Sequence, residues 1–470
     1  MLSRHGYPDV FLYEQEQLAE IAMSVIHRAS LMGATDASVS VSEADNLMVT
    51  VRHHELDVMQ RNRSKQISLT VYAGERRGSA SSTDLSESAI QAALDAAWHI
   101  ASFTTVDPCA GPADSEFLEH APLALDLFHP WVITPQEAIE LARDVEGAAL
   151  EVSPLIINDG DATAFEGEDI TVNSGGASVS AYHSQFFTAT SRGFRGGYAQ
   201  SMHGISCMII AGNAQGMQTG RWHVARRSAS DMGSPQVIGQ TAAMRALARL
   251  NARQLTTGVW PVLFEAPVAS SLVQSLVAAA SGDAQFRGQT FLYESIGCQV
   301  MSDHLTLVER PHEPKGLASA PFDAEGVSTT DRTVVDSGVL RSYFLTSYSA
   351  RKLGLQPTGH AGGPHNLCLS SSFTAASDDL ESMLRKLKRG LLVTNVTSQG
   401  VNIVTGDYSR GVSGFWVDEG RIQYPVEEIT IAGNLREMLQ SIVAVGSDIY
   451  TQGAITTGSV LIDRMQIAGL

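Results

Sequence analysis

The chain of 470 residues contains few cysteines and few of the features that mark secreted or membrane proteins. Its four cysteines, Cys109, Cys207, Cys298 and Cys368, form no C-x-x-C pair, so neither a redox motif nor a zinc knuckle is visible. We expect them to be reduced and mostly buried. The segment after Met1 has no apolar stretch of signal-peptide length, and no apolar run is long enough to span a bilayer. The sequence therefore predicts a cytoplasmic protein.

Basic residues are also scarce. The 50 acidic residues outnumber the 32 basic ones, which gives a formal net charge of −18. A surface this acidic repels phosphate backbones and anionic lipid headgroups, so nucleic acid and membrane surfaces are poor partners for the chain. The remaining composition, with 44% hydrophobic residues and 41 glycines, is typical of a globular, turn-rich protein. The length predicts two domains.

The motifs of the common enzyme classes are missing. There is no Gly-Lys dipeptide for a Walker A loop, no G-x-G-x-x-G entering a helix and no G-x-S-x-G elbow. The two His-Glu pairs, His54-Glu55 and His312-Glu313, lack a second histidine at the spacing that a zinc-peptidase helix needs. His360 and His365 are a close pair in a Gly-rich loop, and we interpret them as loop residues rather than metal ligands.

Hydrophobic periodicity indicates both helices and antiparallel strands in the first half of the chain. Apolar positions follow one helical face in residues 13–32 and 85–103, and we expect both helices on one face of a sheet. Thr134, Pro135 and Glu137 form the signature of a helix start, with a capping box. Another helix is expected at 239–253. Alternating segments predict short strands at 37–41, 47–51, 66–72 and 79–83, and more of them within 155–230.

The second half is rich in β-branched runs and in turns that contain glycine. Hairpins are predicted at 334–340 and 415–422, further strands at 391–397, 426–432 and 458–468, and a helix at 268–281. The sequence thus predicts an α+β protein. Its N-terminal α/β domain, residues 1–245, has an antiparallel sheet with flanking helices, and its C-terminal domain, residues 246–470, is rich in β-structure.

Several long segments carry a resemblance to a known family. They are PFDAEGV at 321–327, LTSYSARKLGLQPTGHAGGPHN at 345–366, TGDYSRGVSGFWVDEGRIQYPVEEITIAGNL at 405–435 and GSVLIDRMQIAG at 458–469, with GSASSTDLS at 78–86 and DPCAG at 107–111 upstream. With these segments the chain resembles the TldD/PmbA family of bacterial metallopeptidases, and within it the TldE/PmbA branch. The resemblance touches nearly the whole chain. It implies a barrel-like C-terminal domain.

The resemblance also implies a zinc site that this chain does not carry. In the TldD branch the motif is His-Glu, three residues, then His, on a helix early in the C-terminal domain, with a Cys near the C-terminus. These positions fall here on Val273, Gln274 and Ala278, and the Cys falls within 454–457, where there is none. Aliphatic side chains offer no lone pair to a metal, and glutamine is no general base at neutral pH. We therefore expect no catalytic residue and no metal in this chain, with zinc bound by a TldD-like partner.

Two polar segments are candidates for lining a peptide cleft. They contain Thr358, Gly359 and His360 in one loop, and Asp407, Tyr408, Ser409 and Arg410 in the other. Loops of this kind often hold binding residues, although turns that the fold requires would look the same.

Three functions stay open at this point. The chain is a non-catalytic subunit that forms a heterodimer with a TldD-like zinc peptidase acting on unfolded or modified peptides, in peptide maturation or degradation of antitoxin-type proteins. Alternatively, it is an autonomous hydrolase with an unrecognised site, such as the His360/His365 loop. The third reading is a homodimeric peptide-binding or scaffold protein without a proteolytic role.

Overall fold

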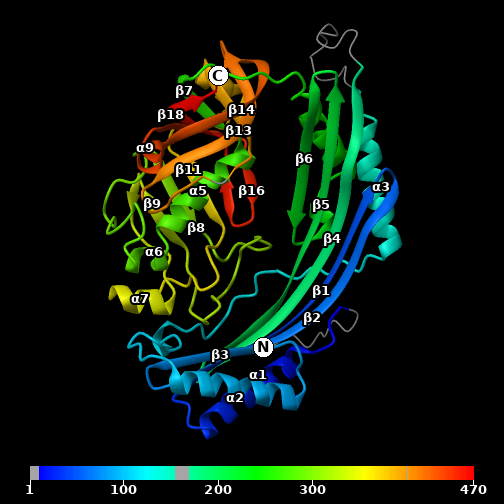
Figure 1. Ribbon diagram of the computed structural model, residues 1–470. Coiled ribbons are helices and arrows are strands. Elements are labelled where there is room, and N and C mark those ends of the chain that lie inside the picture. The colour runs from blue at the N-terminus through cyan, green and yellow to red at the C-terminus, as the bar shows by residue number, and fades with distance from the viewer. Residues whose placement is uncertain (1–9, 154–168, 399, 470) are drawn as a thin grey trace.

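A curved sheet of six antiparallel strands forms the N-terminal part of the computed structural model, which describes residues 10–153, 169–398 and 400–469 (Figure 1). The strand order is β3-β2-β1-β4-β5-β6. The strands are β1 (Asp36–Arg52), β2 (Glu55–Ala73), β3 (Arg76–Ser82), β4 (Thr171–Thr190), β5 (Arg195–Asn213) and β6 (Gly216–Arg226). The helices are α1 (Gln15–Leu31), α2 (Glu87–Phe103), α3 (Pro135–Leu150) and α4 (Pro235–Leu247), with short 3-10 turns η1 (Ser115–Phe117) and η4 (Ala229–Asp231).

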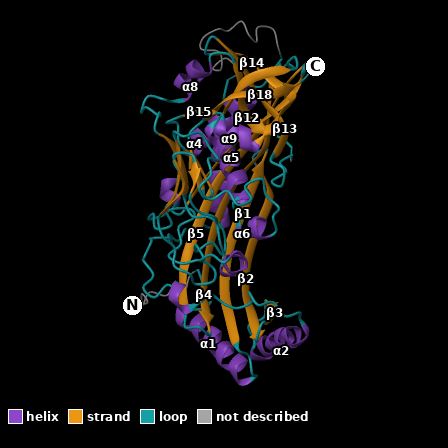
Figure 2. Cartoon of the chain, turned by 90° about the vertical axis from the view of Figure 1, so that its left-hand side faces the viewer, coloured by secondary structure: helices purple, strands orange, loops and turns teal. Residues whose placement is uncertain are grey.

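All four helices cover the same face of this sheet. Successive side chains of a strand point to opposite faces, and in β1 every second residue from Ala37 to Val51 is buried. The first of these residues pack with α1 and α2, and the last pack with α3 and α4. The expectation that the first two helices share one face is therefore confirmed. Figure 2 shows α1 and α2 at one end of the long strands and the C-terminal strands near the other end.

The strands are longer than the sequence predicted. The segments 37–41 and 47–51 are parts of one strand, β1, and the part of 155–230 that the structure describes forms three long strands instead of several short ones. Residues 155–168 lie outside the described residues. The helix expected at 239–253 begins earlier, at Pro235, and ends at Leu247. The helices expected at 13–32 and 85–103, and the capping box of Thr134 and Glu137, are confirmed.

Buried polar side chains separate the two apolar clusters on the helix-covered face. The segment before α3 crosses the sheet here and is bound by side chains of β4 and β5. The backbone N–H of Trp131 donates to Nε2 of His183 at 3.0 Å, and Nε2 of His203 bonds the carbonyl of His129 at 2.8 Å. Ser201 accepts from the backbone N–H of His129 at 2.9 Å. These polar groups therefore fix the position of the crossing segment.

The C-terminal part consists of two mixed sheets with a shared apolar core. One sheet has the order β10-β9-β8-β11-β17-β16, and the other has the order β14-β13-β12-β7-β18-β15. β18 pairs with both β7 and β14, so five strands of the second sheet close into a barrel. The strands are β7 (Gly258–Phe264), β8 (Leu305–Glu309), β9 (Arg332–Asp336), β10 (Val339–Leu340), β11 (Leu367–Ser371), β12 (Gly390–Val396), β13 (Asp407–Asp418), β14 (Arg421–Asn434), β15 (Ile442–Val445), β16 (Tyr450–Gln452), β17 (Ile455–Thr457) and β18 (Val460–Ala468). The helices are α5 (Ala266–Ala279), α6 (Gly282–Phe286), α7 (Ser347–Leu353), α8 (Leu380–Leu387) and α9 (Leu435–Gln440).

Both predicted hairpins of this part are confirmed. β9 turns into β10 at Gly338, and β13 turns into β14 at Gly420; the backbone φ angles of these glycines are 78° and 72°. Only glycine adopts such angles without steric cost, which is why the sequence signal was clear. The α+β class and the barrel expected for the C-terminal half are therefore confirmed. The boundary between residues 245 and 246 stays a prediction.

Side chains of both parts join them into one molecule. The guanidinium of Arg227 is buried and donates to the carbonyls of Gly316 and Leu317, at 3.2 and 2.7 Å. A second guanidinium also links the two parts, because Arg351 of α7 donates to the carbonyl of Gly111 at 2.9 Å. Among the described residues, no helix is long and apolar enough to cross a membrane.

Candidate functional site

Helix α5 occupies the place where the resemblance puts the zinc ligands of the TldD branch. Val273 is 1% exposed and packs in the C-terminal core, Gln274 is exposed, and Ala278 is half-buried. The helix packs against β17, which contains most of the 454–457 segment where the family's cysteine would fall. The two regions to which the resemblance assigns the metal site therefore lie together, and the side chains at these positions are aliphatic, amide or hydroxyl groups.

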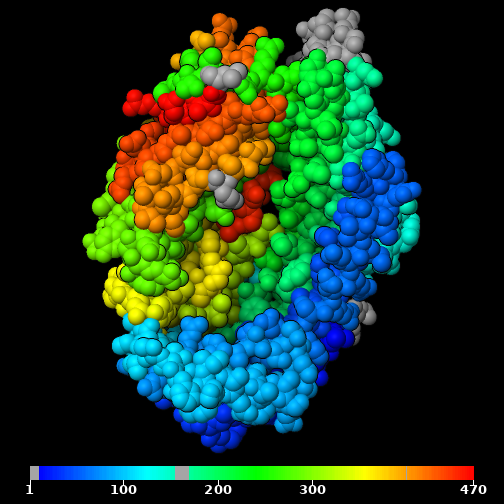
Figure 3. Space-filling model, in the orientation of Figure 1, coloured from blue at the N-terminus to red at the C-terminus, as the bar shows by residue number. Residues whose placement is uncertain are grey.

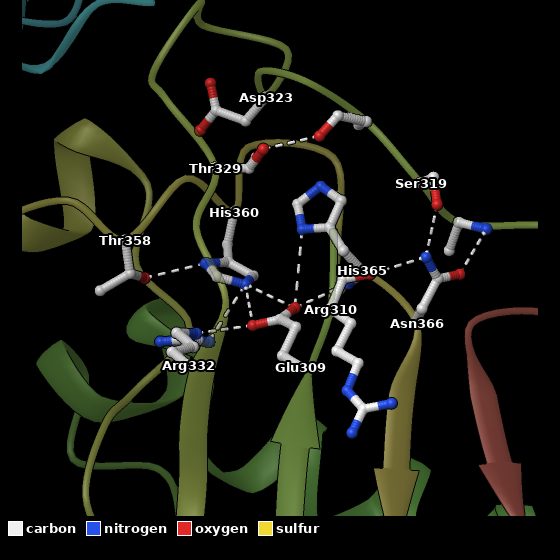
Figure 4. Close-up of polar contacts among 12 residues, drawn as sticks. Glu309, Arg310, Ser319, Asp323, Thr329, Arg332, Thr358, His360, His365 and Asn366 are labelled. Atoms are coloured by element: carbon white, nitrogen blue, oxygen red, sulfur yellow. Dashed lines mark hydrogen bonds and ion pairs between the residues drawn. The ribbon is translucent and has the colours of Figure 1, made fainter. Parts of the chain in front are cut away.

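A buried cluster of charged and imidazole side chains lies at the ends of three neighbouring strands (Figure 4). Glu309 is the last residue of β8 and Arg332 is the first residue of β9. His360 and His365 come from the loop that leads into β11. Because β9 and β11 both pair with β8, the strand ends bring these four side chains together.

The Glu309 carboxylate is the centre of this cluster. Its Oε2 accepts from Nε of Arg332 at 2.6 Å, and its Oε1 accepts from the backbone N–H of His365 at 2.6 Å. Nε2 of His360 donates to Oε1 at 2.8 Å, and Nδ1 of the same ring is 2.9 Å from the Thr358 hydroxyl. The ring of His365 is less tightly held, because its Nδ1 lies 3.5 Å from Oε1. The arrangement holds the 355–366 loop against the ends of the strands.

Burial and charge decide the protonation states in the cluster. Burial by itself would raise the pKa of Glu309, but the hydrogen bonds from the two histidines and the charge of Arg332 outweigh it, so the pKa lies below its ordinary value. Burial lowers the pKa of His360 to about 4, against the opposing effect of its bond to Glu309. At neutral pH the cluster therefore contains one carboxylate, one guanidinium and a neutral His360.

Asp323 lies beside this cluster and holds the same loop from the other side (Figure 4). Its carboxylate accepts from the backbone N–H groups of Glu325 and Val327, at 2.9 Å each, and from that of Ala361 at 3.0 Å. Burial nevertheless raises the pKa of Asp323 to about 7, with a further contribution from the charge of Glu325. Asp323 is thus a loop anchor whose charge depends on pH near neutrality.

The side chains of the cluster include three potential metal ligands. Ligand atoms of Glu309, His360 and His365 lie within 4.8 Å of one another, and two imidazoles with one carboxylate are a set that zinc accepts. However, Nη2 of Arg332 is 3.0 Å from Nε2 of His360, and the guanidinium also bonds the carboxylate. A divalent cation would meet a buried positive charge at hydrogen-bond distance unless Arg332 moved away. The residues fit a charge network better than a metal centre.

The structure separates the two polar segments that the sequence singled out. Thr358, Gly359 and His360 belong to the Glu309 cluster, whereas Asp407, Tyr408, Ser409 and Arg410 begin β13 in the other sheet. In β13, Tyr408 is buried, its two neighbours are exposed, and Nε of Arg410 donates to the carbonyl of Ser398 at 2.8 Å. No hydrogen bond or ion pair joins the two segments within the described ranges. Their role in lining a cleft stays a prediction.

Sequence reasoning missed Glu309 and Arg332. Both residues stand at strand ends without a motif around them, and they are 51 and 28 residues away from His360 along the chain. A glutamate that follows the apolar alternation of Leu305 and Leu307 was the available signal, because such a residue falls on the buried face of the strand. That signal identifies a buried carboxylate but not its partners.

Models of one metallopeptidase family match most of the chain. The model described as PmbA/TldA metallopeptidase domain 1 matches residues 37–101, the central-domain model matches 128–250, and the C-terminal-domain model matches 257–469. Metalloprotease PmbA of Escherichia coli O157:H7 is 43% identical over 455 residues, which cover 97% of each chain.

Solved structures share the fold. A structure from Bacteroides thetaiotaomicron VPI-5482 has a TM-score of 0.87 at 24% identity and covers 98% of this chain and 100% of its own. The structure of TldE from Thermococcus kodakarensis has a TM-score of 0.80 at 17% identity, with 96% of this chain and 100% of its own covered.

Proposed function

Because this chain belongs to the PmbA/TldD family of metallopeptidases, we propose that it is the non-catalytic subunit of a zinc metalloprotease. The zinc is bound by a TldD-like subunit, with which this chain forms a heterodimer in the cytoplasm. The substrates are unfolded or modified peptides, in peptide maturation or in degradation of antitoxin-type proteins. The single observation that carries the proposal is the chemistry of α5, where Val273, Gln274 and Ala278 occupy the motif positions.

The burial of Val273 supports this assignment. The residue is 1% exposed within an apolar cluster, so a histidine there would bring a polar ring into the core. The side of α5 that carries Val273 therefore packs in the apolar core. A metal-binding subunit with the same fold would supply zinc, whose chemical contribution is to polarise the peptide carbonyl and to activate a water molecule. The contribution of this chain is then to bind and orient the peptide.

The experiment compares this chain alone, a TldD-like relative alone and the two together. We expect zinc in the relative and not in this chain, measured by elemental analysis, and cleavage of an unfolded peptide only by the mixture or far faster by it. A variant of the relative that lacks its zinc ligands should abolish cleavage by the mixture. Failure of the two chains to co-purify would favour a homodimeric scaffold instead.

One observation favours a second candidate function. The close approach of Glu309, His360 and His365 would suit an autonomous hydrolase if a metal displaced Arg332. Stoichiometric zinc in the lone chain, together with cleavage that is lost in His360→Gln, would establish that function. The contact of Arg332 with two of the three ligand groups argues against it.

A further inference from the structure

We propose that a pocket between α4 and the C-terminal strands binds a carboxylate next to an apolar side chain on an extended peptide. This proposal deepens the proposed function and rests on it for the peptide substrate. The pocket, called the arginine pocket below, has a volume of about 480 Å³ and lies between α4, β6 and the strands β12, β13 and β14. Its size is in the range of small-ligand sites in proteins.

The apolar wall of the arginine pocket comes from both parts of the molecule. Met208 and Met244 contribute from β5 and α4, and Leu392, Phe415 and Ile422 contribute from the C-terminal strands. Met244 is 39% exposed and Ile422 is 47% exposed, which leaves apolar surface open to solvent at this position. Flexible methionines and an aromatic ring accommodate apolar side chains of several shapes.

The charges of the pocket favour an anion although the chain as a whole is acidic. Its charged residues are Arg221, Arg245, Arg249 and Glu265. Glu265 is engaged by Arg245 through two hydrogen bonds of 2.8 and 2.6 Å, which neutralises that pair. Arg221 and Arg249 form no ion pair with a carboxylate in the part of the chain that the structure describes. The charge of Glu427 acts on Arg249 from outside the pocket lining. Arg221 and Arg249 are therefore two guanidinium groups of the lining without a bonded carboxylate.

The guanidinium groups of Arg221 and Arg249 each have N–H donors that are available for a ligand. Arg249 donates through Nη1 to the carbonyl of Thr219 at 3.0 Å, and Nη2 of Arg221 lies 3.3 Å from the sulfur of Met208. A guanidinium has five N–H donors in a planar fork that suits a carboxylate. Burial lowers the pKa of Arg249 more than the charge of Glu427 raises it, because part of the hydration of Arg249 is lost without a bonded carboxylate. The carboxylate of a bound peptide would replace the hydrogen bonds to water that the Arg249 guanidinium loses on burial.

A second cavity continues from the pocket along the open face of the N-terminal sheet. It has a volume of about 510 Å³ and shares Met208 and Arg221 with the arginine pocket. Its floor consists of small and hydroxyl-bearing residues, among them Ser178, Ser180 and Ser206. Figure 3 shows the surface hollowed between the green strands and the orange and red C-terminal segments. A floor with short side chains leaves room for a polypeptide backbone, which requires hydrogen-bond partners along its length.

The occupant is thus an extended peptide whose backbone lies over the hydroxyl floor. Its apolar side chain enters the arginine pocket, and its carboxylate bonds Arg221 and Arg249. The carboxylate comes either from the C-terminus of the peptide or from an Asp or Glu side chain. A polyanion is disfavoured because the net charge of −18 repels it at longer range.

The test is fluorescence anisotropy with the full chain and three labelled, unstructured peptides. One ends in phenylalanine with a free carboxylate, one has the same sequence with an amide end, and one has an amide end after Asp-Phe. We expect a peptide with a carboxylate to bind at least about tenfold more tightly than the plain amide, as for hydrogen bonds to charged groups. If only the peptide with the free C-terminus binds more tightly than the plain amide peptide, the pocket recognises C-termini. If the Asp-Phe peptide binds as tightly as the peptide with the free C-terminus, the pocket also recognises acidic side chains.

Substitutions in the arginine pocket test whether it causes the preference for peptides with a carboxylate. In Arg221→Met/Arg249→Met the preference for the carboxylate should disappear while binding of the amide peptide persists. The control is Arg76→Met, an exposed arginine on β3 outside the two cavities, which should behave as wild type. If the double variant does not fold, Arg221→Met alone decides, because Arg221 is exposed. Equal binding of acid and amide peptides by wild type, or an unchanged preference in the variants, overturns the proposal.

The same variants separate this inference from the proposed function. Mixed with a TldD-like relative, the double variant should still co-purify with it, and the control Arg76→Met should support zinc-dependent cleavage as wild type does. If the mixture cleaves peptides and the variant retains the carboxylate preference, the pocket assignment is wrong and the subunit function stands. If the mixture never cleaves while the lone chain prefers carboxylates through Arg221 and Arg249, the subunit function is wrong and the pocket stands.

Discussion

His183 lies buried on β4, where its Nε2 accepts the backbone N–H of Trp131. Burial is the largest influence on this imidazole, and the neighbouring His203 acts in the same direction. Together they lower the pKa of His183 to about 4, although Asp45 opposes the shift. A protonated ring could not accept the bond from Trp131, so the folded state favours the neutral form.

This depressed pKa predicts a loss of stability in mild acid. Between pH 6.5 and about 4 the unfolded chain binds a proton at His183 and the folded chain does not, so the free energy of unfolding falls as the pH falls. The loss attributable to His183 is roughly 3 kcal/mol over this range. In His183→Gln, whose amide oxygen still accepts from Trp131, chemical denaturation should show a weaker pH dependence. His27→Gln, at an exposed position of α1, should leave the pH dependence unchanged.

Glu309 supplies a second prediction at this scale. Glu309→Gln leaves Arg332 buried without its carboxylate, so we expect a loss of about 3–5 kcal/mol in the free energy of unfolding. Urea denaturation measures it. The control is Glu313→Gln, since Glu313 is exposed and lies 3.6 Å from Arg310, an ion pair worth about 1 kcal/mol or less. Equal stability of the two variants would show that the cluster does not hold the loop.

The cluster also shows what the sequence could and could not indicate about the site. The pair His360 and His365 was visible as a pattern, because the two residues are close along the chain. Glu309 and Arg332 reach them only through the pairing of β8 with β9 and β11. Register between distant strands is a property of the whole sheet, and no local pattern encodes it.

At the scale of single elements, the start of helix α3 was predictable from the sequence. The capping box of α3 was readable because its residues are three positions apart. In the structure the Thr134 hydroxyl accepts from the backbone N–H of Glu137 at 3.2 Å, and the Glu137 carboxylate accepts from the backbone N–H of Thr134 at 2.8 Å. Local hydrogen bonds of this kind depend on neighbouring residues alone.

This cap can be tested against a matched helix of the same chain. Thr134→Ala should lower the free energy of unfolding by about 1 kcal/mol, because the backbone N–H of Glu137 loses its acceptor. Helix α4 also begins with a proline at its first position, but its N-cap residue, Ser234, makes no side-chain capping bond. Ser234→Ala should therefore change stability by only a few tenths of a kcal/mol. Thermal or urea unfolding of both variants gives the comparison.

Strand length was the feature that local patterns concealed. In the middle of β1, Glu43 and Asp45 take buried positions where the alternation calls for apolar residues, so the strand looked like two. Their carboxylates are bonded from elsewhere in the chain. Glu43 accepts from the backbone N–H of Leu12 at 2.7 Å, and Asp45 accepts from Arg63 at 3.0 Å. Buried polar residues with distant partners are invisible to a periodicity argument.

For the molecule as a whole, polar residues join its two parts at several places, among them Arg227, Arg351 and the ion pair of Lys352 with Asp107. Arg227 is 5% exposed and donates to carbonyls on both sides, including that of Ser201 at 3.1 Å on the sheet and that of Leu317 at 2.7 Å in the C-terminal part. Replacement of its side chain leaves several buried acceptors without a donor. The position is therefore sensitive to substitution.

Arg227→Met tests this junction. We expect a loss of about 2 kcal/mol or more in the free energy of unfolding, with faster limited proteolysis of the segment around Gly316 and Leu317. The neighbouring Arg226→Met is the control, since Arg226 is exposed and its guanidinium donates, within the described residues, to the carbonyl of Ala225 alone. An Arg227 variant with wild-type stability and proteolysis would mean that the other contacts between the two parts hold them together without Arg227.

The order of strands in the first sheet has a consequence for how the nascent chain matures. β1 lies between β2, which follows it at once, and β4, which begins roughly 120 residues later. At about 5–20 residues per second, a ribosome needs on the order of ten seconds to deliver that missing neighbour. During this interval one side of β1 exposes unpaired amide and carbonyl groups, a template for misassembly with other chains. A chaperone that shields this edge during translation should therefore raise the yield of folded protein more than one added after release.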